Sequence, residues 1–181
     1  MNEKKLINQA KAGETNCYSQ LVSMYQERLY HYLLARCHNS FDAEDVLQDT
    51  FINAYKYIQS YQSKWQFSTW LFTIANRLIK KQHDTYYNND ESSQTLIAYP
   101  KHNDFDRNNI WIQIKKVLNS DAYDVLWFFY IEELSIKETA HILQRSQSWV
   151  KISLFRSKKK LANNKNMKKL SNDFLMQGII L

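Results

Sequence analysis

Residues 62–81 read QSKWQFSTWLFTIANRLIKK, and the interpretation of the whole chain depends on this stretch. Apolar side chains recur there every three or four residues, which predicts a helix capped by Ser68 or Thr69. The side chains expected to face a core are Leu71, Ile74, Ala75 and Leu78. Two tryptophans, two phenylalanines and four cations share the same stretch. This mixture raises the question of whether the helix only fills a core or also grips a flat, anionic ligand.

The composition favours helices over strands. The chain has 181 residues but only two glycines and one proline, so it has few residues suited to tight turns. A chain of this length can form one domain or two small ones. We therefore expect an all-α protein.

The first half predicts three helices before the opening stretch. A short helix around Leu6 is expected to stop at Gly13, and a long one to run from Thr15 or Asn16 to about Arg36. In the third, over residues 42–58, Asp42 is expected to be the N-cap. Its polar face should contain Asp45, Gln48, Asp49, Asn53 and Lys56. From the residues alone this could be a solvated acidic face.

The second half predicts a helix-turn-helix after a polar linker. Periodicity is lost over residues 83–109, which hold the only proline. Helices are expected at 110–118 and 121–131, the latter capped by Ser120, and Ser135 with Glu138 forms a capping-box pattern. A short turn then leads to a basic helix. Residues 145–169 contain no acid and nine bases: Arg145, Lys151, Arg156, Lys158, Lys159, Lys160, Lys165, Lys168 and Lys169. Such a block favours a polyanionic partner, although a solvated tail is the plain alternative.

Two motifs in the first half, DAEDVLQDTFINAYKYI and FSTWLFTIA, resemble conserved region two of extracytoplasmic-function (ECF) sigma factors, small relatives of sigma-70. The segment LNSDAYDVLWFFYIEELSIKETAHIL, continued through VKISLFRSKKKL, resembles region four. The resemblance implies two small helical domains joined by a flexible linker. Their expected bounds are 1–82 for region two, 83–109 for the linker, 110–162 for region four and 163–181 for an extension of unknown role.

The resemblance also implies partners and site residues. The chain would bind core RNA polymerase, including the β subunit and the coiled coil of β′, and an anti-sigma factor is a common family partner. The residues expected to bind core polymerase are Asp45, Gln48, Asp49 and Asn53. Those expected to hold the melted minus-ten strand are Tyr61, Lys64, Trp65, Phe67, Trp70, Asn76, Arg77 and Lys80. Those expected to contact the duplex minus-thirty-five element are Arg145, Ser148, Trp149, Lys151, Ile152, Ser153, Phe155, Arg156 and Lys159.

Several positions depart from the family pattern. Arg77 stands where an asparagine is frequent, and Gln144 and Arg145 replace the usual glycine and apolar residue of the turn. Trp149, Ile152 and Phe155 place three apolar side chains on the expected groove-facing surface. They could meet thymine methyls or another protein, so one alternative is an adaptor targeted by an activator or an RNA-guided DNA-binding complex. Another alternative is a stand-alone helix-turn-helix regulator.

Other functional classes have little support. No paired carboxylates with an accompanying base and no glycine-rich phosphate loop are present, so we expect no enzymatic activity. Cys17 and Cys37 form no CxxC pair, and we expect no metal and no cofactor. Without a signal-peptide pattern or a long apolar run, we expect a cytoplasmic protein.

Overall fold

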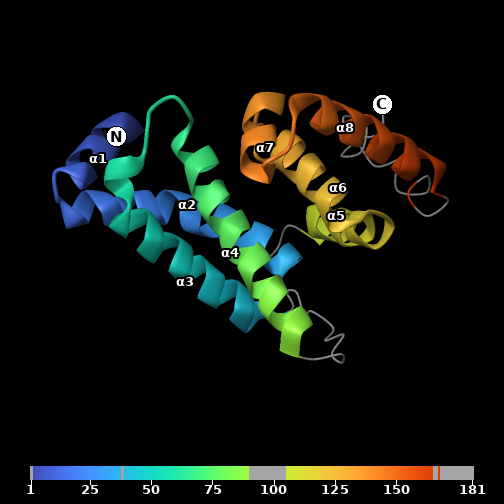
Figure 1. Ribbon diagram of the computed structural model, residues 1–181, viewed down its shortest axis with the longest axis horizontal. Helices are drawn as coiled ribbons and strands as arrows, with labels where there is room; N and C mark the ends of the chain where they lie inside the picture. Colours follow the sequence, from blue (N-terminus) through green and yellow to red (C-terminus); the bar gives the residue numbers. More distant parts are fainter. Residues whose placement is uncertain (1, 38, 90–104, 165–166, 168–181) are drawn as a thin grey trace. The chain divides into compact units, whose positions relative to one another are not determined.

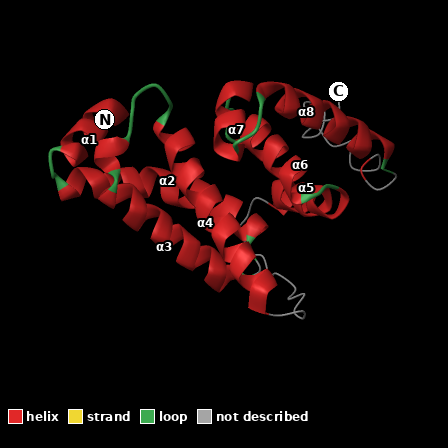
Figure 2. Ribbon diagram, in the orientation of Figure 1, coloured by secondary structure: helices red, strands yellow, loops and turns green. Residues whose placement is uncertain are grey.

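The structure is a computed structural model that describes every residue except 1, 38, 90–104, 165–166 and 168–181 (Figure 1). Its ordered elements are helices, and within these limits no strand occurs (Figure 2). The chain divides into two compact units, Met1–Tyr99 and Pro100–Leu181. The all-α prediction is therefore confirmed. Among the helices that the structure describes, none is long and apolar enough to cross a membrane.

The first unit contains four α-helices and one short 3₁₀ turn. They are α1 (Glu3–Lys11), α2 (Thr15–Arg36), α3 (Ser40–Lys56), η1 (Ile58–Ser60) and α4 (Phe67–Asn89). Gly13 follows α1 with a φ of 97°, a conformation that glycine adopts without strain, and it allows the sharp turn into α2. In Figure 1, α3 and α4 run side by side, and both contact α2.

The start of α3 differs from the prediction because a different residue caps it. The side chain of Asn39, not Asp42, is the N-cap, and its Oδ1 accepts the Asp42 N–H at 2.8 Å. Asp42 then occupies the first turn, where its carboxylate complements the helix dipole and accepts a hydrogen bond from Asn39 Nδ2 at 3.1 Å. Asn and Asp cap helices about equally well, so the pattern could not decide between them.

The buried side of α4 is broader than predicted. Leu71 and Ala75 are buried as expected, but Ile74 and Leu78 are only half-buried, and Phe72, Asn76 and Ile79 lie in the interior instead. The reason is that α4 packs against both α2 and α3. The Phe72 ring meets the Tyr32 ring of α2 edge-on, with centroids 5.5 Å apart.

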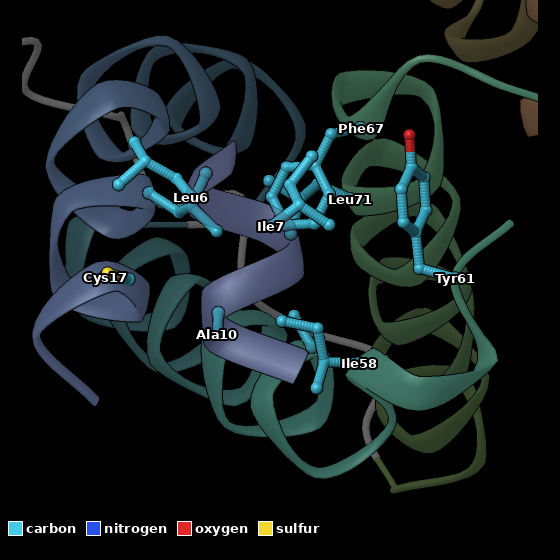
Figure 3. Packing of buried hydrophobic residues seen from close by; sticks show 10 residues of the cluster. Leu6, Ile7, Ala10, Cys17, Ile58, Tyr61, Phe67 and Leu71 are labelled. Carbon is cyan, nitrogen blue, oxygen red and sulfur yellow. The ribbon is translucent and has the colours of Figure 1, made fainter. Parts of the chain in front are cut away.

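A hydrophobic cluster joins α1 to the loop and helix that hold the opening stretch. Figure 3 shows Ile7 of α1 beside Phe67 and Leu71 of α4, with Tyr61 near them, while Leu6 belongs to the same cluster on the other side of α1. The other buried members of this cluster are Ala10, Cys17, Leu21, Ala54 and Ile58. The first helix therefore supports the segment that is predicted to hold the melted DNA strand.

The second unit is built from shorter helices. They are α5 (Phe105–Val117), α6 (Ser120–Leu126), the π-helical segment η2 (Trp127–Ile131), α7 (Ile136–Leu143) and α8 (Gln147–Asn163). Asn119 caps α6 in place of Ser120, because its side chain accepts the Ala122 N–H at 3.0 Å.

The helix-turn-helix of the second unit has well-defined ends. The capping box of Ser135 and Glu138 is confirmed at the start of α7. Gln144 adopts the left-handed conformation after α7, the role that glycine commonly fills. Ser146 then caps α8, which therefore begins two residues before Trp149.

The predicted linker is too long at both ends. Helix α4 continues to Asn89 and α5 already begins at Phe105, so the helices take in residues 83–89 and 105–109. Asn, Asp and Tyr are weak helix formers, but adding residues to an existing helix costs little. The middle of the linker and nearly all of the extension at 163–181 lie outside the described residues.

Candidate functional site

The outer face of α3 is the first candidate surface. Asp45, Gln48 and Asp49 are exposed, as predicted, while Asn53 is half-buried. The opposite side of the helix is anchored by the buried residues Ala43, Val46, Thr50 and Ala54. Core packing therefore fixes the direction in which the two acids point.

The same face carries large apolar side chains that the sequence analysis missed. Phe41 is 77% exposed and Ile52 is 54% exposed. Their spacing with Asp45 and Gln48 (41, 45, 48, 52) follows one stripe of a helix, and this regularity was the signal that could have revealed them. Exposed apolar groups beside charged ones are typical of a protein-binding surface.

An apolar groove of about 560 Å³ lies between α2 and α3, next to this face. Tyr18 and Val22 of α2 and Leu47, Phe51 and Ile52 of α3 are among its lining residues. The Tyr18 hydroxyl donates a hydrogen bond to the Phe51 carbonyl at 2.6 Å, and burial raises the pKa of Tyr18. The tyrosine is therefore a neutral donor that ties the two helices together.

The opening stretch forms the second candidate surface, and its aromatic residues differ in burial. Phe67 is only 1% exposed and lies 5.6 Å from the Tyr25 ring, 5.3 Å from Tyr61 and 5.5 Å from Trp70, measured between centroids. Trp65 and Trp70 are half-buried. Tyr61 is also buried, so the prediction that the rings of Phe67 and Tyr61 face DNA is wrong. Phe67 supports the aromatic cluster from inside, and the two tryptophans are the rings within reach of a ligand.

Tyr61 links the cluster to the loop. Its hydroxyl donates to the Trp65 carbonyl at 2.8 Å, and Lys11 Nζ donates to the Tyr61 carbonyl at 2.7 Å. Burial, with a contribution from the negative charge of Glu3, raises the pKa of Tyr61. The tyrosine is thus held from α1 and in turn holds the backbone of Trp65.

The polar members of this predicted site are divided between surface and interior. Lys64, Arg77 and Lys80 are exposed, and the Lys64 ammonium lies 5.7 Å from the centre of the Trp65 ring. Asn76 is only 1% exposed, so the prediction that it faces DNA is wrong. It sits one helical turn from Phe72 and one from Ile79, on the side of α4 that packs into the unit.

The outer face of α8 is the third candidate surface. Val150, Leu154, Ser157 and Leu161 seat the helix on its unit. The residues predicted to contact duplex DNA all retain exposed surface: Trp149 and Ser153 are half-buried, and Arg145, Ser148, Lys151, Ile152, Phe155, Arg156 and Lys159 are exposed.

Arg145 is held in place at the start of α8. Its guanidinium donates to Asp121 Oδ2 at 3.1 Å and lies 5.2 Å from the centre of the Trp149 ring. Asp121 and Trp149 also line a shallow groove of about 460 Å³ with Ile152, Ser153 and Arg156. An acid therefore partly neutralises one of the cations expected to meet phosphate.

Comparison with known proteins decides the family. The family model of sigma-70 region 2 matches residues 21–85 of the sequence, which include α3 and most of α4. The ECF RNA polymerase sigma factor SigW of Bacillus subtilis is 32% identical over 176 residues, covering 87% of this chain and 94% of SigW. SigM of the same organism is 30% identical over 157 residues, covering 78% and 91%. The chain belongs to the ECF sigma factor family.

Solved structures agree on the fold of this sigma factor. The sigma factor RpoE of Bartonella quintana, solved with the anti-sigma factor NepR, aligns with a TM-score of 0.68 at 17% identity. The alignment covers 87% of this chain and 98% of RpoE. Family membership does not favour the adaptor or the stand-alone regulator. Among the described residues, the sigma factor has no group of three or more His, Cys, Asp or Glu side chains placed to hold a metal.

Proposed function

We propose that this sigma factor binds core RNA polymerase through α3 and directs promoter recognition, melting and transcription initiation. The observation that carries the proposal is the outer face of α3, which lies within the segment matched by sigma-70 region 2. There Asp45 and Asp49 are exposed beside Phe41 and Ile52. The acids would pair with cations of the β′ coiled coil, and the apolar side chains would lose water on docking. The sigma factor bound to core polymerase would also contact the β subunit.

The opening stretch would capture the melted minus-ten strand. An unpaired base stacked on an aromatic ring gains about 1–3 kcal/mol, which is comparable with the cost of unstacking it from the duplex. Trp65 and Trp70 supply partly exposed rings, while Lys64, Arg77 and Lys80 supply positive charge for phosphates. Because Lys64 lies over the Trp65 ring, a base would displace the ammonium or stack on the opposite face.

Helix α8 would bind the upstream element as duplex. It carries no acidic residue and five basic ones: Lys151, Arg156, Lys158, Lys159 and Lys160. Lysine and arginine placed against phosphates release counterions, which provides much of the affinity for DNA. The protein itself would make and break no covalent bond, so catalysis would stay with the polymerase.

An anti-sigma factor is a further proposed partner. It would have to cover surfaces that the polymerase otherwise uses, and the exposed face of α3 is the natural candidate. The solved complex of RpoE with NepR supports this proposal by analogy of fold.

The experiment that tests docking through α3 compares two charge reversals. Asp49→Lys removes an exposed acid from the proposed face, whereas Glu27→Lys reverses an acid of α2 that is 84% exposed. The affinity of each full-length variant for core polymerase is measured without DNA. We expect a loss of at least tenfold for Asp49→Lys and little change for Glu27→Lys, because a like charge in an interface costs several kcal/mol. Equal affinities would exclude α3 as the docking face.

A further inference from the structure

The outer face of α8 carries a short apolar ridge. Ile152 is 50% exposed and Phe155 is 69% exposed, on a helix that already buries Val150, Leu154 and Leu161 on its other side. At about 100° per residue, Ile152 lies opposite Leu161, and Phe155 lies about 60° from Ile152. Both side chains of the ridge therefore lie on the half of α8 opposite its buried residues, and Ile152 also borders the shallow groove that α8 shares with Asp121, the acid paired with Arg145.

Cations flank this ridge on both sides. By the same geometry Lys151 and Lys158 follow the Phe155 side, and Arg156 and Lys160 follow the Ile152 side. Lys159 continues the line of the ridge itself. With the exception of the half-buried Lys158, these cations are exposed, and α8 contains no acidic residue. The charge pattern is thus complementary to an object with two negative edges and a neutral or apolar floor.

The major groove of B-DNA has that character. It is about 12 Å wide, which admits one α-helix between two rows of phosphates. Its floor offers hydrogen-bonding groups and, on thymine alone among the four bases, a methyl group. An acidic protein partner could satisfy the cations, but it would not require them on both flanks of a central apolar line.

We propose that Ile152 and Phe155 read thymine methyl groups in the upstream element. This proposal rests on the proposed binding of duplex DNA by α8 and names its base preference. Three residues span about 4.5 Å along a helix, close to the roughly 3.4 Å between successive base pairs. The two side chains would therefore contact thymines on neighbouring base pairs, and flanking cations would contact phosphates of both strands.

The test uses deoxyuridine, which pairs as thymine does but lacks the methyl group. Full-length protein bound to core polymerase is first used to select upstream sequences from duplexes with a randomised segment and a pre-melted start region. The selected element is then made in thymine and deoxyuridine forms, and their affinities are compared. We expect neighbouring thymines in the element and about fourfold weaker binding for each methyl group removed. No enriched element, an element without thymine, or equal binding of the two forms would overturn the proposal, and absence of enrichment would leave a protein as the occupant of the ridge.

Variants assign the methyl contacts to individual side chains. Ile152→Ala and Phe155→Ala should bind the thymine form more weakly and lose the discrimination against deoxyuridine. Lys159→Gln should weaken both forms equally, because phosphates are the same in each. Ile131→Ala removes another exposed apolar side chain of the same unit and should keep the full discrimination. Unchanged discrimination in both ridge variants would overturn the assignment.

A failure of the proposed function can be recognised separately. If the protein does not join core polymerase, the proposed function fails, and the comparison is repeated with the protein alone on matched duplexes containing runs of thymine or of deoxyuridine. Discrimination that depends on Ile152 and Phe155 would still support methyl readout. Equal binding would overturn it.

Discussion

Separate substitutions of Phe67 and Trp65 should distinguish a residue that stabilises the fold from one that binds single-stranded DNA. Phe67 is almost fully buried among the rings of Tyr25, Tyr61 and Trp70, whereas Trp65 is half-buried on the neighbouring loop. Truncating a buried phenylalanine to alanine costs about 3–5 kcal/mol, a large part of the roughly 5–15 kcal/mol that stabilises a domain. Phe67→Ala should therefore lower the midpoint of thermal unfolding strongly.

Trp65→Ala should have the opposite profile. Losing one base-stacking contact of about 1–3 kcal/mol corresponds to about 5- to 150-fold weaker binding of a single strand. The loop would keep the hydrogen bond from the Tyr61 hydroxyl to the backbone carbonyl of residue 65, so the fold should lose little stability. Phe67→Leu retains much of the buried volume and should lie between Phe67→Ala and the unmodified protein in stability.

Two measurements on each full-length variant are sufficient. Circular dichroism gives the thermal midpoint, and fluorescence anisotropy with a labelled single-stranded minus-ten oligonucleotide, in complex with core polymerase, gives the affinity. We expect Trp65→Ala to lose affinity at nearly unchanged midpoint. If Trp65→Ala instead lowered the midpoint as much as Phe67→Ala and left the affinity unchanged, Trp65 would be a core residue and the reasoning would be refuted.

Three further predictions concern the second unit. Changing Lys158, Lys159 and Lys160 together to glutamine should flatten the slope of log affinity for duplex DNA against log salt by up to about 2.7, because each phosphate contact contributes about 0.9 to that slope. The control variant, Lys4→Gln with Lys5→Gln, should leave the slope unchanged. An unaltered slope for the α8 variant would mean that these lysines only solvate the helix. Asp121→Asn should tighten the binding of duplex DNA, because it releases Arg145 and removes a negative charge. The free energy of unfolding should change by no more than about 1 kcal/mol, as expected for an exposed ion pair. Weaker binding would contradict this prediction and show that the ion pair positions Arg145 for DNA. Ser135→Ala should lower the free energy of unfolding by about 1 kcal/mol, because it removes the capping box of α7. Chemical denaturation measures this change, with Ser148→Ala, at an exposed position, as the control. Equal stability of the two variants would contradict the role of the cap.

The helices were largely predictable from the sequence because their signals are local. The bounds of α2 and the capping box of α7 follow from spacing and from residues within one turn. The caps of α3 and α6 were each assigned to the wrong neighbour, because Asn39 precedes other cap-forming residues and Asn119 precedes Ser120. The local sequence pattern therefore predicted where helices occur more accurately than it predicted the residue that caps each one.

The surfaces were less predictable because burial depends on contacts from distant parts of the chain. Asn76 lies inside because α4 is covered by two helices at once, a packing that the spacing of α4 alone does not reveal. Phe41 and Ile52 were missed for the opposite reason, since an apolar residue in a helix is assumed to face the core. The part that Lys11 plays in the site was not predictable either, because its ammonium donates a hydrogen bond to the carbonyl of Tyr61, fifty residues away in the sequence.

The most direct test of the central claim is run-off transcription with purified core polymerase, coupled to sequencing of the transcript starts. We predict that the full-length protein makes core polymerase start at defined positions, and that Asp49→Lys abolishes these starts while Glu27→Lys preserves them. Transcript starts that are the same with and without the protein would contradict its function as a promoter-specificity subunit.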